Sequence, residues 1–433
     1  IVFFQCPYIL FGICQPVLIV SQKERMKVLI TQRGARHRYM IPRILNDAGI
    51  LECLYTDSHN KSFIGRVGNV LSKFGVRSPQ LTRLMKREIP LPPSKVKSSD
   101  LLFWKQLSGR FRHSSIVDSI RLNYECNDAT FKRWGIGNAD CLYTMFIDNL
   151  AFVEYAKSKG LYVIADIYEN PYIFNELVLE IDRNPEYACV DYLKTQYSAY
   201  GAIRMQRFDR LLALADSYTV PSEYVHKCIK RSCNFDERKV CVIPYPSSIS
   251  TISNPNRPVK GRIIWVGNDS VRKGLVYCQR AAKELKKWYG DIDFRIIGQV
   301  EPEIRNSPSF RDLNFIGKLN KAELEAELKV ADMYVFPTLA EGFAGTVIEA
   351  ASYGVPIITT ENSGCGQDFP ARFVPERNHD AILTEVSCLL ENRVERDALS
   401  RKTFAYTQKL SKEAYSKNLL ALMSYVENHK QMA

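Results

Sequence analysis

The sequence is poor in the residues that usually hold metal ions. It contains only six histidines, and its twelve cysteines are scattered, with no C-x-x-C pair and no Cys/His cluster at metal-ligand spacing. Structural zinc sites need closely spaced ligands, so we expect no metal site of this kind. We interpret the cysteines instead as reduced thiols in the core of a cytosolic protein.

Acidic residues are also in the minority. The chain has 47 Asp and Glu against 59 Lys and Arg, which gives a formal net charge of +12 at pH 7. This excess favours anionic partners such as a nucleoside diphosphate, a lipid phosphate or anionic headgroups. Nucleic acid would fit the charge too, but the sequence has no recognised nucleic-acid motif and we expect no such partner. With 433 residues, 46% of them hydrophobic, the chain is long enough for two domains.

Charge is missing altogether from residues 1–20. A stretch of this length could just cross a bilayer, but two prolines and two glutamines interrupt it and no basic region precedes it. The segment that begins Met26-Lys-Val-Leu-Ile, in contrast, is typical of a first Rossmann-like strand just after a start codon. We therefore expect residues 1–25 to form an extension outside the fold, with a membrane anchor as the alternative.

The stretch 335–364, VFPTLAEGFAGTVIEAASYGVPIITTENSG, contains the most functional information. Its pattern predicts a strand at Met333–Phe336, a glycine-containing loop, a helix at Thr346–Ser352 and a buried strand at Val355–Thr360. In such a unit the loop and the helix start lie at the carboxyl edge of a parallel sheet, where free backbone amides can bind phosphate. The amides expected to do so belong to Gly345, Thr346 and Val347.

Two carboxylates flank this anion site. Glu341 lies in the loop and Glu349 about one turn into the helix, with seven residues between them. A carboxylate does not bind phosphate, but it accepts hydrogen bonds from two sugar hydroxyls at once. Together with the following ASYGVPIITT, this arrangement resembles the E-x7-E signature of glycosyltransferase family 4, whose members use nucleotide sugars. Ala344, where many members have glycine, is one departure.

The resemblance implies an α/β protein with the GT-B fold, in which two Rossmann-like domains face a central cleft. We expect an apolar extension (1–25), an acceptor-side domain (26–252), a linker (253–260), a nucleotide-sugar domain (261–412) and a C-terminal helix (413–433) that packs back on the first domain. The linker is placed at SNPNRPVK because its prolines and polar residues cannot continue a helix or a strand.

A second motif, GRIIWVGNDSVRKG, opens the predicted nucleotide-sugar domain. It resembles the family's strand followed by a VG-R and KG pattern, in which an arginine and a lysine hold the diphosphate. Lys273 matches the family lysine, and Gly267 matches the glycine. Asn268 stands where the family has arginine, so we expect Arg272 to supply the missing positive charge. Their role would be to neutralise the charge that builds on the departing nucleoside diphosphate.

The first half matches the family only in outline. The resemblance places the Gly34 loop opposite the donor diphosphate, and Arg33, Arg36 and Arg38 make that loop basic. Where many members have a histidine that contacts the transferred sugar, this chain has Asp166-Ile-Tyr-Glu. The acceptor-side candidates are therefore Asp166, Tyr168 and Glu169. Asp166 or Glu169 could serve as a base, and each could equally cap the end of a strand.

Residues 61–125 are basic and rich in apolar side chains. They contain thirteen Lys and Arg against four Asp and Glu. Basic amphipathic segments of this kind can lie on an anionic membrane, which would suit an enzyme with a lipid-linked acceptor. A solvated face over a hydrophobic core is the commoner explanation.

The resemblance implies a retaining hexosyltransferase that acts without metal or other cofactor in cell-surface polysaccharide or glycolipid synthesis. Its donor would be a UDP- or GDP-hexose, its acceptor a glycan or a lipid-linked molecule, and its location the cytoplasm or the inner face of the plasma membrane.

Asp291 and Asp293 form a D-x-D pair, but it precedes a predicted strand, whereas metal-dependent glycosyltransferases place this motif after one. The alternative is a non-catalytic GT-B module that binds a nucleotide sugar or an anionic glycan. The residues expected at the site are Glu341, Lys273 and Arg272 for catalysis, and Gly267, Asn268, Phe343, Ala344, Gly345, Thr346, Val347, Glu349 and Gly34 for donor binding.

Overall fold

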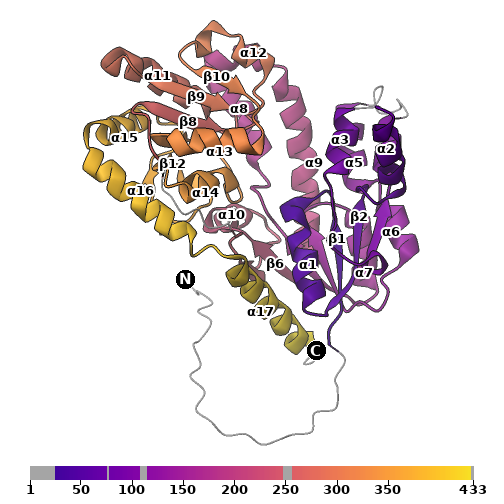
Figure 1. The fold of residues 1–433 in the computed structure, drawn as a ribbon. Coiled ribbons are helices and arrows are strands. Elements are labelled where there is room, and N and C mark those ends of the chain that lie inside the picture. Colours follow the sequence, from indigo (N-terminus) through magenta and orange to yellow (C-terminus); the bar gives the residue numbers. More distant parts are fainter. Residues whose placement is uncertain (1–24, 76–77, 108–114, 247–255, 431–433) are drawn as a thin grey trace, which may run out of the picture.

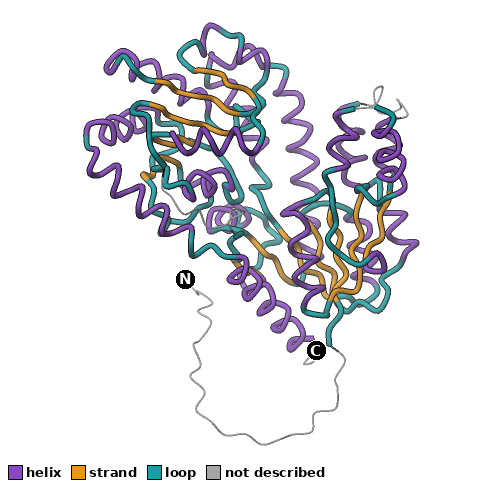
Figure 2. The backbone as a smooth tube through the Cα atoms, viewed as in Figure 1, coloured by secondary structure: helices purple, strands orange, loops and turns teal. Residues whose placement is uncertain are grey.

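The computed structural model describes residues 25–75, 78–107, 115–246 and 256–430. The predicted extension, apart from its last residue, and the first part of the predicted linker lie outside these ranges. The described chain forms two parallel β-sheets, each covered by helices (Figure 2). Among the described residues, no helix is both long and apolar enough to span a bilayer.

The first sheet has seven strands in the order β3-β2-β1-β4-β5-β6-β7. The strands β1 and β4 are buried at every position because helices cover both faces of the sheet. The strands are β1 (Val28–Gln32), β2 (Leu51–Asp57), β3 (Val96–Ser99), β4 (Cys141–Met145), β5 (Tyr162–Asp166), β6 (Ser217–Val220) and β7 (Val240–Val242). The helices of this half are α1 (Met40–Asp47), α2 (Phe63–Lys73), α3 (Pro79–Met85), α4 (Leu101–Leu107), α5 (Ile116–Glu125), α6 (Asp128–Trp134), α7 (Leu150–Ser158), α8 (Ile173–Arg183), α9 (Leu193–Leu214) and α10 (Glu223–Ile229).

The second sheet has six strands in the order β10-β9-β8-β11-β12-β13. The strand order reverses between β8 and β11, and ligands of open α/β sheets bind beyond the carboxyl ends of the strands at such a point. The strands are β8 (Arg262–Val266), β9 (Asp293–Ile297), β10 (Asn314–Gly317), β11 (Met333–Phe336), β12 (Ile357–Thr359) and β13 (Arg372–Phe373). The helices are α11 (Leu275–Tyr289), α12 (Pro302–Arg305), α13 (Lys321–Val330), α14 (Gly345–Ser352), α15 (His379–Glu391), α16 (Arg393–Thr407) and α17 (Lys412–Lys430).

A segment of the first half packs with the core of the second. Side chains of α8, of the 3₁₀ helix η3 (Pro185–Val190) and of the start of α9 join the hydrophobic cluster built around the second sheet. Buried Tyr187 fixes this contact, because its hydroxyl donates to the Ser270 carbonyl at 3.1 Å and accepts from the Val276 amide at 3.1 Å. The long helix α9 then runs on into the first half (Figure 1). The segment predicted as one domain, 26–252, therefore contributes to both cores.

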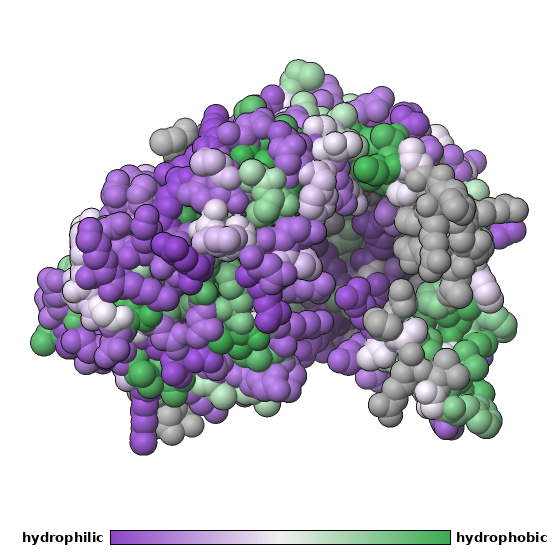
Figure 3. All heavy atoms as spheres, turned by 90° about the horizontal axis from the view of Figure 1, so that it is seen from above, coloured by the Kyte–Doolittle hydropathy of each residue, from purple (hydrophilic) through white to green (hydrophobic). Residues whose placement is uncertain are grey.

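The last helix returns to the first sheet. Tyr415, Leu419 and Val426 of α17 are buried in the cluster that includes β1 and β4. The Met26 amide donates to the Glu427 carboxylate at 2.9 Å, which joins the two ends of the described chain. Seen from above, the molecule is hollowed between the two halves, and mostly hydrophilic side chains line this cleft (Figure 3).

Candidate active site

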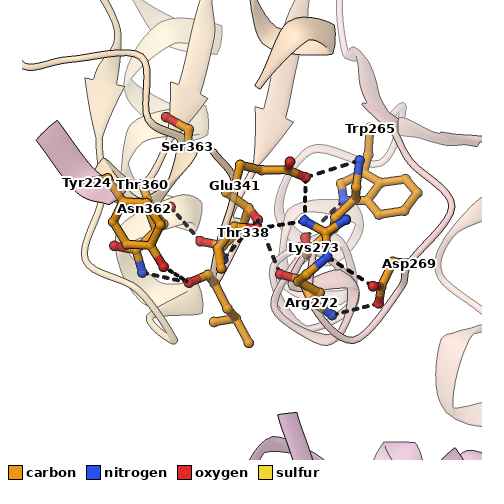
Figure 4. Close-up of polar contacts among 12 residues, drawn as sticks. Tyr224, Trp265, Asp269, Arg272, Lys273, Thr338, Glu341, Thr360, Asn362 and Ser363 are labelled. Atoms are coloured by element: carbon orange, nitrogen blue, oxygen red, sulfur yellow. Dashed lines mark hydrogen bonds and ion pairs between the residues drawn. The ribbon is translucent and has the colours of Figure 1, made fainter. Parts of the chain in front are cut away.

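Arg272, Lys273 and Glu341 meet at one point in the structure. Arg272 and Lys273 lie in the loop between β8 and α11, and Glu341 lies in the loop between β11 and α14. The Glu341 carboxylate oxygen Oε1 is 2.8 Å from Nη1 of Arg272 and 3.4 Å from Nζ of Lys273 (Figure 4). Both loops follow adjacent strands of a parallel sheet, which brings two segments 68 residues apart to the same edge.

Backbone contacts hold the two loops against each other. The Leu339 amide donates to the Arg272 carbonyl at 2.8 Å, and Nη1 of Arg272 donates to the Ala340 carbonyl at 2.7 Å. A Cβ atom on Gly274, whose φ is +68°, would lie 2.1 Å from the Pro337 carbonyl oxygen. Only glycine therefore allows the β8–α11 loop to come this close. The Lys273–Gly274 pair thus supplies both a positive charge and the close approach that sets its position.

An aspartate that the sequence analysis did not single out orients Arg272. The Asp269 carboxylate accepts hydrogen bonds from the Arg272 amide at 3.2 Å and from its Nε at 3.0 Å. Burial alone would lower the pKa of Arg272, but the Glu341 and Asp269 carboxylates raise it above its ordinary value. The one sequence signal for this role is the position of Asp269 three residues before Arg272 in the same loop.

Lys273 is held in a confined environment. A Cβ atom on Gly267 would lie 2.5 Å from Cδ of Lys273, and the indole of Trp265 donates to the Lys273 carbonyl at 3.2 Å. Burial lowers the pKa of Lys273 below its ordinary value, while the Glu341 carboxylate opposes this shift. Gly267 is therefore needed for the space that the lysine side chain fills.

The start of α14 offers unoccupied backbone donors. No side chain caps this helix, and Gly345 is exposed, with no atom within 4 Å of where its Cβ would be. Within the described chain no acceptor is recorded for the Gly345 and Thr346 amides, whereas the Val347 amide donates to the Ala344 carbonyl at 3.0 Å. Two of the three amides expected to meet phosphate are thus available as the structure stands.

Three predicted donor residues lie around this centre with other partners. Burial raises the pKa of half-buried Glu349, although Lys321 and Arg38 oppose the rise. The Phe343 ring stands edge-on to the Tyr245 ring of the first half, with the centroids 6.3 Å apart. The Asn268 side-chain oxygen accepts from the Gln299 amide at 2.9 Å. The carboxylates of the E-x7-E pair therefore occupy different environments, and Glu341 is the one joined to the cations.

A hollow of about 140 Å³ lies beyond the carboxyl ends of β9 and β10. It begins beside Asn268, whose side chain is bonded to Gln299 of its wall. Its lining combines apolar and basic residues with two glycines and a glutamine. The lining residues are Gly298, Gln299, Val300, Arg305, Phe315, Gly317 and Lys318.

The first half contributes the opposite wall of the cleft. A Cβ atom on Gly342 would lie 1.6 Å from the Tyr168 carbonyl oxygen, and the Ser222 hydroxyl donates to the Gly342 carbonyl at 2.6 Å. The loop that contains Glu341 is therefore in direct contact with the segment after β5. This contact brings the acceptor-side candidates next to the ion-paired centre.

The three acceptor-side candidates have different surroundings. Asp166 is fully buried, accepts from the Tyr245 hydroxyl at 3.2 Å, and has a pKa that burial raises. The guanidinium of Arg36 lies 3.1 Å from the centre of the Tyr168 ring. Glu169 pairs with Arg204 at 2.6 Å; burial would raise its pKa, but the charge of Arg204 brings it below the ordinary value.

Gly34 and Asp293 of the D-x-D pair have internal partners. The Gly34 amide donates to the Asp57 carboxylate at 2.8 Å, which fixes the loop after β1. The Asp293 carboxylate pairs with Arg295 at 3.0 Å. In the ranges that the structure describes, no three His, Cys, Asp or Glu side chains are grouped so as to hold a metal ion.

Two Rossmann-like sheets that face each other across a cleft, with loops at their carboxyl edges in contact, define the GT-B class of fold. Residues 260–392 match a family model described as glycosyl transferases group 1. The chain is 30% identical over 111 residues to a 2-deoxystreptamine N-acetyl-D-glucosaminyltransferase of Niallia circulans, covering 24% of this chain and 28% of that protein. It is 25% identical over 154 residues to an amylovoran biosynthesis glycosyltransferase of Erwinia amylovora, covering 32% and 37%.

The structural comparison extends over nearly the whole chain. The sucrose-phosphate synthase of Thermosynechococcus elongatus superimposes with a TM-score of 0.65 at 13% identity, covering 93% of this chain and 99% of that one. The GT-B fold expected from the sequence is thereby confirmed. In sequence, the chain spans about a third of the length of the curated relatives it matches.

Proposed function

We propose that the protein is a retaining glycosyltransferase that moves a hexose from a UDP- or GDP-hexose to a hydroxyl of a glycan or lipid-linked acceptor. The observation that carries this proposal is the meeting of Arg272, Lys273 and Glu341 at the carboxyl edge of the second sheet. The similarity of residues 260–392 to group 1 glycosyltransferases supports the same reaction. The similarity to an amylovoran biosynthesis glycosyltransferase supports a biosynthetic role. As in the sequence analysis, we assign the reaction to cell-surface polysaccharide or glycolipid synthesis, in the cytoplasm or at the inner face of the plasma membrane.

The cations would act on the leaving group. When the bond between sugar and phosphate breaks, negative charge builds on the diphosphate, and Arg272 and Lys273 would neutralise it in place of a divalent cation. The free amides of Gly345 and Thr346 would donate to the same anion. Without donor, the ion pairs to Glu341 keep these half-buried charges balanced.

Carboxylates and the nearby hollow would orient the rest of the donor. Glu341 would accept hydrogen bonds from sugar hydroxyls, and Glu349 from the ribose. The hollow beside Asn268 has the size and the mixed lining suited to the nucleotide base. On the acceptor side, Asp166 is enclosed, so Glu169 is the carboxylate that an incoming hydroxyl would meet.

A non-catalytic module that binds a nucleotide sugar is the second candidate. Asn268 favours it, because this residue stands where the resembling family has a phosphate-binding arginine and its side chain is already bonded to Gln299. Such a module would bind the donor through the same cations but release no nucleotide.

Nucleotide release separates the two functions. The protein is incubated with a panel of UDP- and GDP-hexoses, with and without lipid extract, and free UDP or GDP is measured. Turnover that falls at least 100-fold in Lys273→Ala and Glu341→Ala supports the transferase, because a preorganised charged contact contributes about 2.7 to 4 kcal/mol to the transition state. Lys287→Ala, on the outer face of α11, is the matched control. Tight binding of a sugar nucleotide without turnover would establish the module instead.

A further inference from the structure

Helix α2 has a second apolar face that is turned to solvent. Its inner face contains Ile64, Gly65 and Gly68, which are buried. The outer face contains Phe63, 67% exposed, and Phe74, which directly follows the helix and is 81% exposed. At 3.6 residues per turn the outer apolar residues fall within an arc of about 100°. We call this set the α2 stripe: Phe63, Val67, Val70, Leu71 and Phe74.

The rest of the fold fixes the outward direction of the stripe. A Cβ atom on Gly65 would lie 2.1 Å from the His59 carbonyl oxygen, so the inner face of α2 lies directly on the preceding loop. Ser62 caps the helix, and Asp100 accepts hydrogen bonds from the Ser62 hydroxyl at 2.8 Å and from the Ile64 amide at 3.0 Å. The helix cannot roll the stripe inward without breaking these contacts.

Exposed apolar side chains are concentrated in the part of the sequence that contains the stripe. Of the fifteen large hydrophobic residues exposed in the described chain, nine lie between positions 63 and 117. They come from α2, α4 and α5, and hydrophobic side chains are visible at the edge of the molecule that α2 occupies (Figure 3). The four outside the α2 stripe are Leu101, Trp104, Ile116 and Val117.

Basic side chains border the stripe. Arg66 and Lys73 lie on one flank of α2, and both are exposed. Helices α2, α3 and α4 together contain four Lys or Arg and no Asp or Glu. An apolar strip with a cationic border matches the boundary between acyl chains and anionic headgroups in a bilayer.

We propose that the α2 stripe docks on an anionic lipid membrane. A second copy of the chain fits less well, because a two-fold contact with antiparallel α2 helices would place the two basic flanks, each with Arg66 and Lys73, against each other. Docking does not depend on the proposed glycosyl transfer. If both hold, docking places the cleft near lipid-linked acceptors, since only five residues separate the carboxyl end of β2 from the start of α2.

Vesicle flotation of the full chain tests the apolar part of the proposal. We expect binding to phosphatidylcholine vesicles that contain phosphatidylglycerol, and at least tenfold weaker binding by Val70→Glu/Phe74→Glu. Each substitution removes an apolar group that the membrane would bury and adds a negative charge that the anionic lipid repels. Val394→Glu is the matched control, since Val394 is 80% exposed on α16. Unchanged thermal unfolding of both variants shows that the fold is intact.

A second pair of variants tests the charges. Arg66→Gln/Lys73→Gln is expected to weaken binding about fivefold for each charge removed, and Lys287→Gln to leave it unchanged. Absence of binding, equal binding to pure phosphatidylcholine, or an α2 variant that binds like the control would overturn the proposal. So would a change in oligomeric state on size-exclusion chromatography without vesicle binding, which would make the stripe a contact between copies. These measurements need no sugar nucleotide, so their failure is distinct from failure of the proposed transferase.

Discussion

Gly342→Ala tests whether the contact between the two halves is required for turnover. The new Cβ atom would lie 1.6 Å from the Tyr168 carbonyl oxygen, whereas ordinary contacts begin at 3.4 Å. The Glu341 loop and the Tyr168 segment would have to separate by roughly 2 Å, which is the difference between these values. The Ser222 hydrogen bond to the Gly342 carbonyl, 2.6 Å long, would also be lost.

The magnitude follows from how steeply catalysis depends on position. A misplacement of about 1 Å costs about 100-fold in rate, so we expect kcat/KM to fall by at least that factor, or about 2.7 kcal/mol. Arg272 and Lys273 lie wholly in the second half, so the Kd for free UDP or GDP, measured by calorimetry, should change less than twofold.

Two further measurements complete this test. Small-angle scattering should show a larger radius of gyration for Gly342→Ala. Gly345→Ala, whose methyl group would meet no atom within 4 Å, is the control for protein stability. Full activity of Gly342→Ala at an unchanged radius of gyration would refute the reasoning, because the contact would then be unnecessary.

Four other perturbations have expected outcomes. Burial lowers the pKa of Lys273 below the ordinary lysine value of 10.5, so the lysine should lose its charge, and the protein its affinity for the nucleotide, at a pH below 10.5. A Kd that stays constant up to pH 10.5 would contradict this. Asp269→Asn should raise KM and lower kcat about tenfold through loss of one charged hydrogen bond to Arg272, with the overall unfolding free energy little changed. Burial raises the pKa of Asp128 to about 6, so the protein should lose stability as the pH rises from about 4 through 6. In urea unfolding, Asp128→Asn should be up to about 3 kcal/mol more stable than the unmodified protein at pH 8, and no more stable below pH 4. Glu180, with no exposed surface, pairs with Arg377 at 2.8 Å, so Glu180→Ala should cost about 3 to 5 kcal/mol of unfolding free energy, and a loss below 1 kcal/mol would show that the pair is dispensable.

Periodicity and turn residues predicted the elements around the site well. The expected strand at Met333–Phe336 is confirmed residue for residue. The helix expected at Thr346–Ser352 is also present, and it begins one residue earlier, at Gly345. The strand expected at Val355–Thr360 is shorter, Ile357–Thr359, because Pro356 has no amide proton and the Val355 amide donates to the Ala350 carbonyl at the end of α14.

Contacts between distant segments were harder to predict. The motifs identified Lys273 and Glu341 because each stands in a recognisable local pattern. The pairing of Glu169 with Arg204 joins a loop to a helix, and no local pattern marks it. The apolar residues of α2 have helical periodicity, but periodicity does not show which of two apolar faces a fold will cover. The structure leaves one such face in solvent, and this is the observation behind the docking proposal.

The packing of α8 and η3 limits how the molecule can be divided. A fragment that begins at the interdomain linker would lack Tyr187 and the other side chains of this segment that complete the second core. Chimeric proteins made by exchanging halves at the linker would therefore join the second half to foreign helices on its inner side. A single boundary inside α9 would not help, because the side chains before Tyr197 complete the second core, whereas the rest of α9, β6 and α17 belong to the cores of the first half.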